Sequence, residues 1–180
     1  MRNAWIKFEG NHEFSQPHKV ISVKDGDKTL YILNYVKRPT GVKDDETVFI
    51  SSGITDNNTN QQSIVGRGVL SKFKTSNEVK PEWVDKYPWM GHYKYYIVLK
   101  ELECVDAPRK DSLFLNQVLE TIGANTYPSS TGKDVTLKQL RQKHTQKMHL
   151  RITEEAKNYI NQELNKVFET YGTTTYHSDI

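Results

Sequence analysis

Alternating hydrophobic and polar positions in the first half of the chain predict a β-sheet. The segments with this alternation, or with a short apolar run, are 4–8, 29–36, 47–52, 63–73 and 93–105. Both faces of 95–99 are apolar, so this strand is expected to lie in the middle of the sheet. The segment 55–62 contains no apolar residue and is expected to be a loop. Gly66 and Gly68 share one strand face, which indicates a bend or a close approach of backbone or ligand.

The second half of the chain changes to a helical period. Apolar residues at helical spacing run over 115–122, from Leu137 to Met148, and over 154–171. Thr153 is the expected N-cap of the last helix and Gly172 its end, and the tail 173–180 is expected to be frayed. The whole pattern predicts an α+β fold, with helices packed on a curled sheet or a β-barrel in a single domain over 1–172.

Composition narrows the class of protein without naming a ligand. The 180 residues include a single cysteine, Cys104, which excludes an internal disulfide and a cysteine-based zinc site. The six histidines have no zinc-motif spacing, so no metal site is expected. No other cofactor is expected either. No apolar run reaches the roughly 18 residues that a membrane span needs, and the start lacks a signal core. We therefore expect a cytoplasmic protein with no membrane partner.

Charge is distributed unevenly along a chain whose net charge is only +3. Residues 64–100 carry seven basic and three acidic side chains, whereas 152–180 carry two basic and five acidic ones. Clustered lysine and arginine are typical of surfaces that bind phosphates, although a solvated surface has the same composition. Charge alone therefore leaves nucleic-acid binding open.

One segment, 83–96, is unusually rich in aromatic residues with cations between them. It contains Trp83, Tyr87, Trp89, Tyr93, Tyr95 and Tyr96, with Lys86, His92 and Lys94 among them. Aromatic side chains on a loop beside cations can stack on an unpaired base. The same side chains could instead cover the open end of a barrel, and the sequence leaves both interpretations open.

Three short segments resemble the EVE domain, a member of the PUA-like superfamily related to the YTH and ASCH domains. They are 4–9 (AWIKFE), 47–52 (TVFISS) and 63–69 (SIVGRGV). The resemblance implies a PUA-like fold and binding of RNA or of modified bases in DNA. Several members of the superfamily are targeting modules of restriction systems, so a motor or nuclease partner encoded separately is a further expectation.

These observations together predict a non-catalytic nucleic-acid-binding module that takes a flipped base, including a modified one, into an aromatic pocket at the end of the sheet. The residues expected to form this pocket are Ser51, Ser52, Trp83, Trp89 and Tyr93. The residues expected to bind phosphates are Arg67, Lys72, Lys74, Arg109, Lys110, Arg141 and Lys147.

Two alternatives remain at this stage. The first is a small ASCH-like amidohydrolase acting on modified nucleosides, in which Lys7 and Glu9 share a proton role from one strand face. These two residues would otherwise be a surface ion pair. The second is a protein-interaction domain that uses the acidic C-terminal helix.

Overall fold

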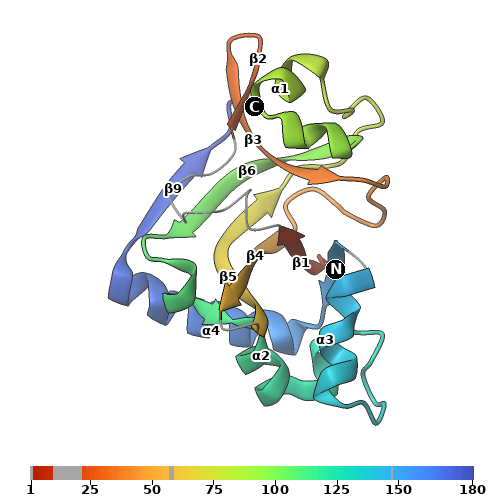
Figure 1. Ribbon diagram of the computed structural model, residues 1–180, viewed down its shortest axis with the longest axis vertical. Coiled ribbons are helices and arrows are strands. Elements are labelled where there is room, and N and C mark those ends of the chain that lie inside the picture. The colour runs from red at the N-terminus through yellow and green to blue at the C-terminus, as the bar shows by residue number, and fades with distance from the viewer. Residues whose placement is uncertain (1, 10–21, 57–58, 147) are drawn as a thin grey trace.

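The computed structural model describes residues 2–9, 22–56, 59–146 and 148–180 (Figure 1). These residues form a mixed α+β fold, in which nine strands make one curled sheet and four α-helices pack around it. The strand order is β2-β3-β6-β5-β4-β1-β8, with β7 paired to β5 and β9 paired to β6. Strands β1 and β4 are parallel, and the other neighbours are antiparallel.

The elements follow one another along the chain with short connections. The strands are β1 (Ala4–Glu9), β2 (Ser22–Asp25), β3 (Lys28–Tyr35), β4 (Thr47–Asp56), β5 (Thr59–Leu70), β6 (Tyr95–Val105), β7 (Leu113–Phe114), β8 (His149–Ile152) and β9 (Thr173–His177). The α-helices are α1 (Pro81–Lys86), α2 (Leu115–Ile122), α3 (Leu137–Gln146) and α4 (Glu154–Tyr171). Three 3-10 turns, η1 (Pro88–His92), η2 (Arg109–Asp111) and η3 (Gly123–Thr126), complete the described elements.

The curl of the sheet comes from its central strands. A Cβ added at Gly66 would lie 2.9 Å from the carbonyl oxygen of Glu103, so glycine permits the close approach of β5 to β6. The β4–β5 register shifts between Ile50 and Ser51, and such irregularities bend and twist a sheet. The sheet curls until β3 faces β8, yet no backbone ladder among the described residues joins these two strands. The predicted curled sheet is therefore present, and it is open.

Three apolar clusters hold this architecture together. One lies between the sheet and helices α2, α3 and α4, which cross the lower end of the molecule in Figure 1. A second fills the inside of the curl, with side chains from β1, β3, β4, β5 and β6. A third lies between β2, β3 and β6 on one side and α1 with η1 on the other. The site described below opens beside the second cluster.

The C-terminal helix confirms the sequence prediction in full. Helix α4 begins after Thr153, whose Oγ1 accepts a hydrogen bond from the backbone N–H of Ala156 at 3.1 Å. It ends at Gly172, whose φ of 86° is a conformation that glycine adopts without strain. None of the described helices has the length and apolar character that a membrane crossing requires.

Two expectations about secondary structure were wrong, and one strand was not predicted at all. The polar segment 55–62 belongs largely to the β4–β5 hairpin, where its described backbone continues the ladder, as in the pair Ile54↔Gln61. Residues 149–152, which follow the helical stripe, form β8 against β1. The tail is not frayed, because β9 pairs with β6 and the ring of Tyr176 packs 5.1 Å from that of Tyr31. In the end of the β4–β5 hairpin and in β9, backbone pairing stabilises strands whose sequences have no apolar period.

Candidate functional site

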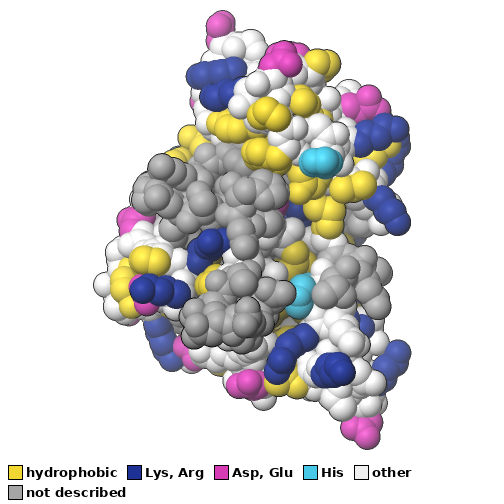
Figure 2. Space-filling model, in the orientation of Figure 1, with side chains coloured by type: hydrophobic (Ala, Val, Ile, Leu, Met, Phe, Trp, Pro, Cys, Tyr) yellow, Lys and Arg dark blue, Asp and Glu magenta, His cyan; other side chains and the backbone are white. Residues whose placement is uncertain are grey.

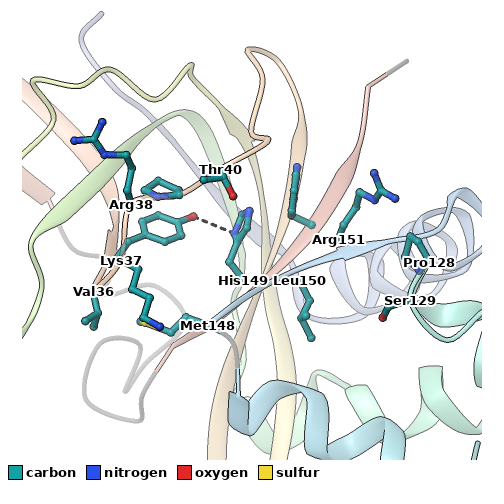
Figure 3. Close-up of a pocket in the computed structure, with 13 residues that line it drawn as sticks. Val36, Lys37, Arg38, Thr40, Pro128, Ser129, Met148, His149, Leu150 and Arg151 are labelled. Atoms are coloured by element: carbon teal, nitrogen blue, oxygen red, sulfur yellow. Dashed lines mark hydrogen bonds between the residues drawn. The ribbon is translucent and has the colours of Figure 1, made fainter.

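A pocket opens where the curled sheet fails to close, between the end of β3 and strand β8. Its volume is about 710 Å³. It is lined by Trp5 of β1, by Tyr35 and residues 36–40 at the end of β3, by residues 148–151 in and before β8, and by Pro128 and Ser129 (Figure 3). Four segments far apart in the sequence therefore meet at one open seam.

Aromatic rings form the inner wall of this pocket. The imidazole of His149 stacks on the indole of Trp5, with centroids 4.3 Å apart and planes 23° apart. The Tyr35 ring meets His149 edge-on at 5.4 Å, and its hydroxyl is 3.1 Å from His149 Nδ1, the bond dashed in Figure 3. These three side chains bridge the seam that the backbone leaves open.

A buried carboxylate fixes the indole. Glu46, immediately before β4, is fully buried, and its Oε1 accepts hydrogen bonds from Trp5 Nε1 at 3.1 Å and from the Lys43 backbone N–H at 2.7 Å. Charge-assisted hydrogen bonds of this kind hold a side chain in one orientation. The indole is therefore positioned before any ligand arrives.

A second buried pair lies beside the pocket. Lys7 and Glu9 point to the same side of β1, and Lys7 Nζ is 3.0 Å from Glu9 Oε1, with side chains 0% and 3% exposed. The Lys7 Nζ also lies 5.0 Å from the centroid of the Tyr35 ring. This pair is not the surface ion pair considered above, although neither residue lines the pocket.

The inner wall stays uncharged at ordinary pH. Burial, with a smaller effect from the Lys7 cation opposite it on β1, lowers the pKa of His149 to about 3. Burial, and then the nearby Glu9 carboxylate, raise the pKa of the Tyr35 phenol well above its usual value. The pocket therefore presents an indole, a phenol and a neutral imidazole.

The rim of the pocket is cationic. Lys37, Arg38 and Arg151 line it, and none of the described lining residues is acidic. Arg38 and Arg151 flank His149 in Figure 3, from the end of β3 and from β8 respectively. Figure 2 shows, at the upper right of the molecule, dark blue cationic side chains next to yellow hydrophobic ones. An aromatic hollow with a cationic rim fits a flat ligand that carries negative charge at its edge.

The predicted serines do not reach this pocket. Ser51 and Ser52 are fully buried in β4. The Ser51 hydroxyl donates to Gln62 Oε1 at 2.9 Å, and Ser52 Oγ accepts from Arg109 Nη1 at 3.1 Å. Both hydroxyls take part in contacts within the β4–β5 hairpin and η2, and neither lines the hollow.

The predicted aromatic residues divide into a core residue and a surface cluster. Trp83 is 3% exposed, packs in the third apolar cluster, and donates its indole N–H to the carbonyl oxygen of Lys24 at 2.9 Å. It offers no open face to a base. Trp89 and Tyr93 are half-buried, with rings 6.0 Å apart, and do not line the pocket. Their segment adjoins the rim, since Lys94 N–H donates to the Tyr35 carbonyl at 3.0 Å.

The predicted phosphate-binding residues are not gathered in one place. Arg67 is a bridge within the fold: it pairs with Glu103 at 3.1 Å and donates to Asn161 of α4 at 2.9 Å. Arg109 donates to the Gly53 carbonyl oxygen at 2.6 Å. Four others, Lys72, Lys74, Lys110 and Arg141, are exposed and lie outside the pocket lining, while Lys147 falls outside the described residues.

The described part of the chain offers no evident place for a metal. It contains no group of three or more His, Cys, Asp or Glu side chains placed to hold an ion. Cys104 is buried, and burial raises the pKa of its thiol to about 12, which disfavours the thiolate that nucleophilic chemistry requires. The residues that line the pocket can stack on, hydrogen-bond to and make cationic contact with a ligand.

Lowering the pH from about 7 to about 5 is expected to lower the free energy of unfolding by about 2 kcal/mol through His149 alone. The unfolded chain takes up a proton on this imidazole near its ordinary pKa of 6.5, whereas the folded chain, with a pKa of about 3, does not. The unfolded state then binds more protons, so stability falls as pH falls through this window.

Urea denaturation of wild type and His149→Phe at both pH values measures this contribution. The variant should lose about 2 kcal/mol less than wild type on acidification, because its ring cannot be protonated. Other groups that titrate in this range are shared by both proteins and cancel in the difference. Equal losses in the two proteins would contradict the buried, neutral state of His149.

Comparisons with known proteins assign neither a family nor a function to the chain. No family model matches the sequence, and no curated protein shows significant similarity to it.

Proposed function

We propose that this chain is a non-catalytic nucleic-acid-binding module of the PUA-like type. It holds one unstacked base, a modified base included, in the pocket between β3 and β8. The observation that carries this proposal is the pairing of an uncharged aromatic wall with a rim of three cations and no described acidic residue. A nucleotide combines the same two features, a flat ring and a negatively charged phosphate.

The dimensions and chemistry of the pocket suit such a ligand. A volume of about 710 Å³ lies within the usual range of small-molecule sites. Stacking of a base on an aromatic side chain contributes about 1–3 kcal/mol, and it tolerates different bases because each has a flat face. Lys37, Arg38 and Arg151 would contact the flanking phosphates. The open curled sheet also agrees with the fold that the EVE resemblance implies.

Binding to oligonucleotides at several salt concentrations tests the proposal. A panel of single- and double-stranded DNA and RNA, with and without base methylation, should include a ligand whose affinity falls steeply as salt rises. Replacing Arg38 or Arg151 by alanine should weaken binding and reduce the slope of log affinity against log salt by about 1 for each phosphate that the variant no longer neutralises.

Lys110→Ala is the matched control, because Lys110 is an exposed cation outside the pocket lining. It should leave the salt slope almost unchanged. Equal effects of the rim variants and Lys110→Ala would place binding elsewhere on the molecule. The absence of binding across the whole panel would refute the proposed function.

One observation favours a second candidate, the small amidohydrolase. The Lys7–Glu9 pair is buried next to Tyr35, and a buried lysine beside a carboxylate is an arrangement that proton transfer can use. Wild-type protein incubated with acylated nucleosides should then release free acid. No product after prolonged incubation, with the oligonucleotide binding intact, would leave the binding module as the function.

A further inference from the structure

A second aromatic surface lies next to the pocket, on the same face of the sheet. Tyr95 of β6 is the ladder partner of Tyr35, whose side chain lines the pocket. Directly opposite residues of an antiparallel ladder have Cβ atoms about 4.5–5.5 Å apart and project from the same face. Tyr35 belongs to the second apolar cluster and is 3% exposed, whereas Tyr95 packs against that cluster and is only half-buried. Part of the Tyr95 side chain is therefore accessible just outside the pocket.

Phe73 extends this aromatic surface. Its ring meets that of Tyr95 edge-on, with centroids 6.0 Å apart and planes 82° apart. Phe73 follows β5 and is half-buried like Tyr95. Edge-to-face packing is a preferred arrangement of two aromatic rings, so each ring holds the other in place. We call these two rings the Phe73–Tyr95 platform.

One cation of the pocket rim also contacts this platform. The Arg38 guanidinium lies 5.5 Å from the centroid of the Tyr95 ring, which is within the range of a cation–π interaction. Arg38 also lines the pocket, and in Figure 3 its side chain extends away from His149. The same guanidinium therefore connects the pocket with the platform.

Further cations lie around the platform. Lys94 Nζ is 5.5 Å from the centroid of the Tyr95 ring, and the exposed Lys72 and Lys74 are the sequence neighbours of Phe73. Surfaces that bind single-stranded nucleic acids combine aromatic rings, on which successive bases stack, with cations that follow the backbone. The platform and its cations have both features.

We propose that the Phe73–Tyr95 platform is a second base-binding position, and that the ligand is a single strand with at least two consecutive nucleotides. One base enters the pocket, its neighbour stacks on the platform, and Arg38 contacts the phosphate that joins them. The first base rests on the proposed function, whereas the second position rests on the platform and its cations. A duplex covers its base faces by its own stacking, so an unpaired strand is the form that fills both positions.

Two DNA oligonucleotides with equal numbers of phosphates test the second position. One is a strand of eight thymidines, and the other alternates thymidine with abasic residues, so that no two bases are adjacent. Wild type should bind the thymidine strand at least about fivefold more tightly in fluorescence anisotropy, because each stacked base contributes this much or more. A difference no larger than the ratio of the base counts would overturn the second position.

Leucine substitutions separate stacking from packing. Phe73→Leu and Tyr95→Leu keep apolar bulk but remove a ring, so each should weaken binding of the thymidine strand by about fivefold or more and affect the alternating strand much less. Tyr31→Leu is the matched control, because Tyr31 is another half-buried tyrosine beside the second apolar cluster, with its ring against Tyr176 and outside the pocket lining. If Tyr31→Leu weakened binding as much as the platform variants, stacking on the platform would be refuted.

The charge beside the platform gives an independent measurement. Glu78 is exposed and its backbone forms an isolated bridge with Tyr95, so this acid lies next to the expected path of the phosphates. Glu78→Gln should tighten binding of the thymidine strand at low salt. Glu120→Gln, in an exposed acid of α2, removes the same charge and should have a smaller effect. Equal effects of the two variants would place the phosphates away from the platform and contradict the proposal.

The outcomes distinguish this inference from the proposed function. Weakened binding in Arg151→Ala, together with wild-type affinity in both platform variants, would retain the pocket and refute the second position. The reverse pattern would retain the platform and refute the pocket. Failure of wild type to bind the thymidine strand would refute the second position, even if a duplex binds. If Tyr95→Leu did not fold, Phe73→Leu and the wild-type comparison of the two strands would decide.

Discussion

Replacing Trp83 by alanine is expected to lower the free energy of unfolding by about 3–5 kcal/mol, the usual cost of deleting a buried aromatic side chain. Trp83 is 3% exposed, its ring meets Tyr96 edge-on at 4.8 Å, and its indole N–H donates to the Lys24 carbonyl oxygen. The substitution leaves a cavity between α1 and the sheet and removes the partner of a backbone carbonyl. The aromatic composition of 83–96 predicts a binding residue here, and the structure predicts a core residue instead.

Urea denaturation followed by circular dichroism measures the effect, with Trp89→Ala as the matched control. Trp89 is half-buried, so the same substitution there should cost clearly less. A Trp83→Ala protein with wild-type stability and weakened oligonucleotide binding would show that this indole is a recognition residue after all.

Glu9→Gln is expected to lower the free energy of unfolding by a similar amount, about 3–5 kcal/mol. The substitution removes the negative charge that balances Lys7, whose side chain is 0% exposed. Beyond Glu9, the described contacts of Lys7 Nζ are the Phe8 carbonyl oxygen at 3.4 Å and the Tyr35 ring. An ammonium group without a counter-charge is costly at this depth.

Two further variants make this prediction specific. Glu163→Gln removes a carboxylate that lies 2.8 Å from the exposed Lys166 ammonium, in a pair much less buried than Lys7–Glu9, and should cost less than about 1 kcal/mol. The double variant Lys7→Met/Glu9→Gln removes both charges and should recover most of the stability that Glu9→Gln removes. If Glu9→Gln cost no more than Glu163→Gln, the Lys7–Glu9 pair would not be buried in solution.

Local periodicity was sufficient to predict several elements. Helix α4 has a clear amphipathic pattern, a capping threonine and a terminal glycine, all within twenty residues of sequence. The hydrophobic alternation of β3 and the apolar centre of β6 were equally clear, and both segments were predicted to be strands. The two glycines predicted a bend or a close approach of backbone or ligand, and at Gly66 the structure shows a close approach to the backbone of β6.

Elements that depend on pairing with distant residues could not be predicted in this way. The end of the β4–β5 hairpin and β9 have polar sequences, and they are strands because their backbones complete ladders. The sequence gives no sign of such a ladder when the segment that completes it has no apolar period of its own. Polar composition was mistaken for a loop in the first case and for a frayed end in the second.

The candidate site was missed for a related reason. Tyr35 and His149 are 114 residues apart, and only the curl of the sheet brings them within hydrogen-bonding distance. Composition drew attention to 83–96, where many aromatic residues are neighbours in sequence, but composition does not show which rings face the core. A lone histidine following a helical stripe gave no comparable signal.

The position of β9 has a consequence for how the chain folds during synthesis. One edge of β6 pairs with β3 over Tyr95–Leu99 and with β9 over Glu101–Val105. Because β9 follows every other strand in chain order, this half of the β6 edge has no partner until residues 173–177 leave the ribosome. An unpaired edge can recruit strands from neighbouring chains, so nascent molecules that stall before this point are the ones expected to aggregate.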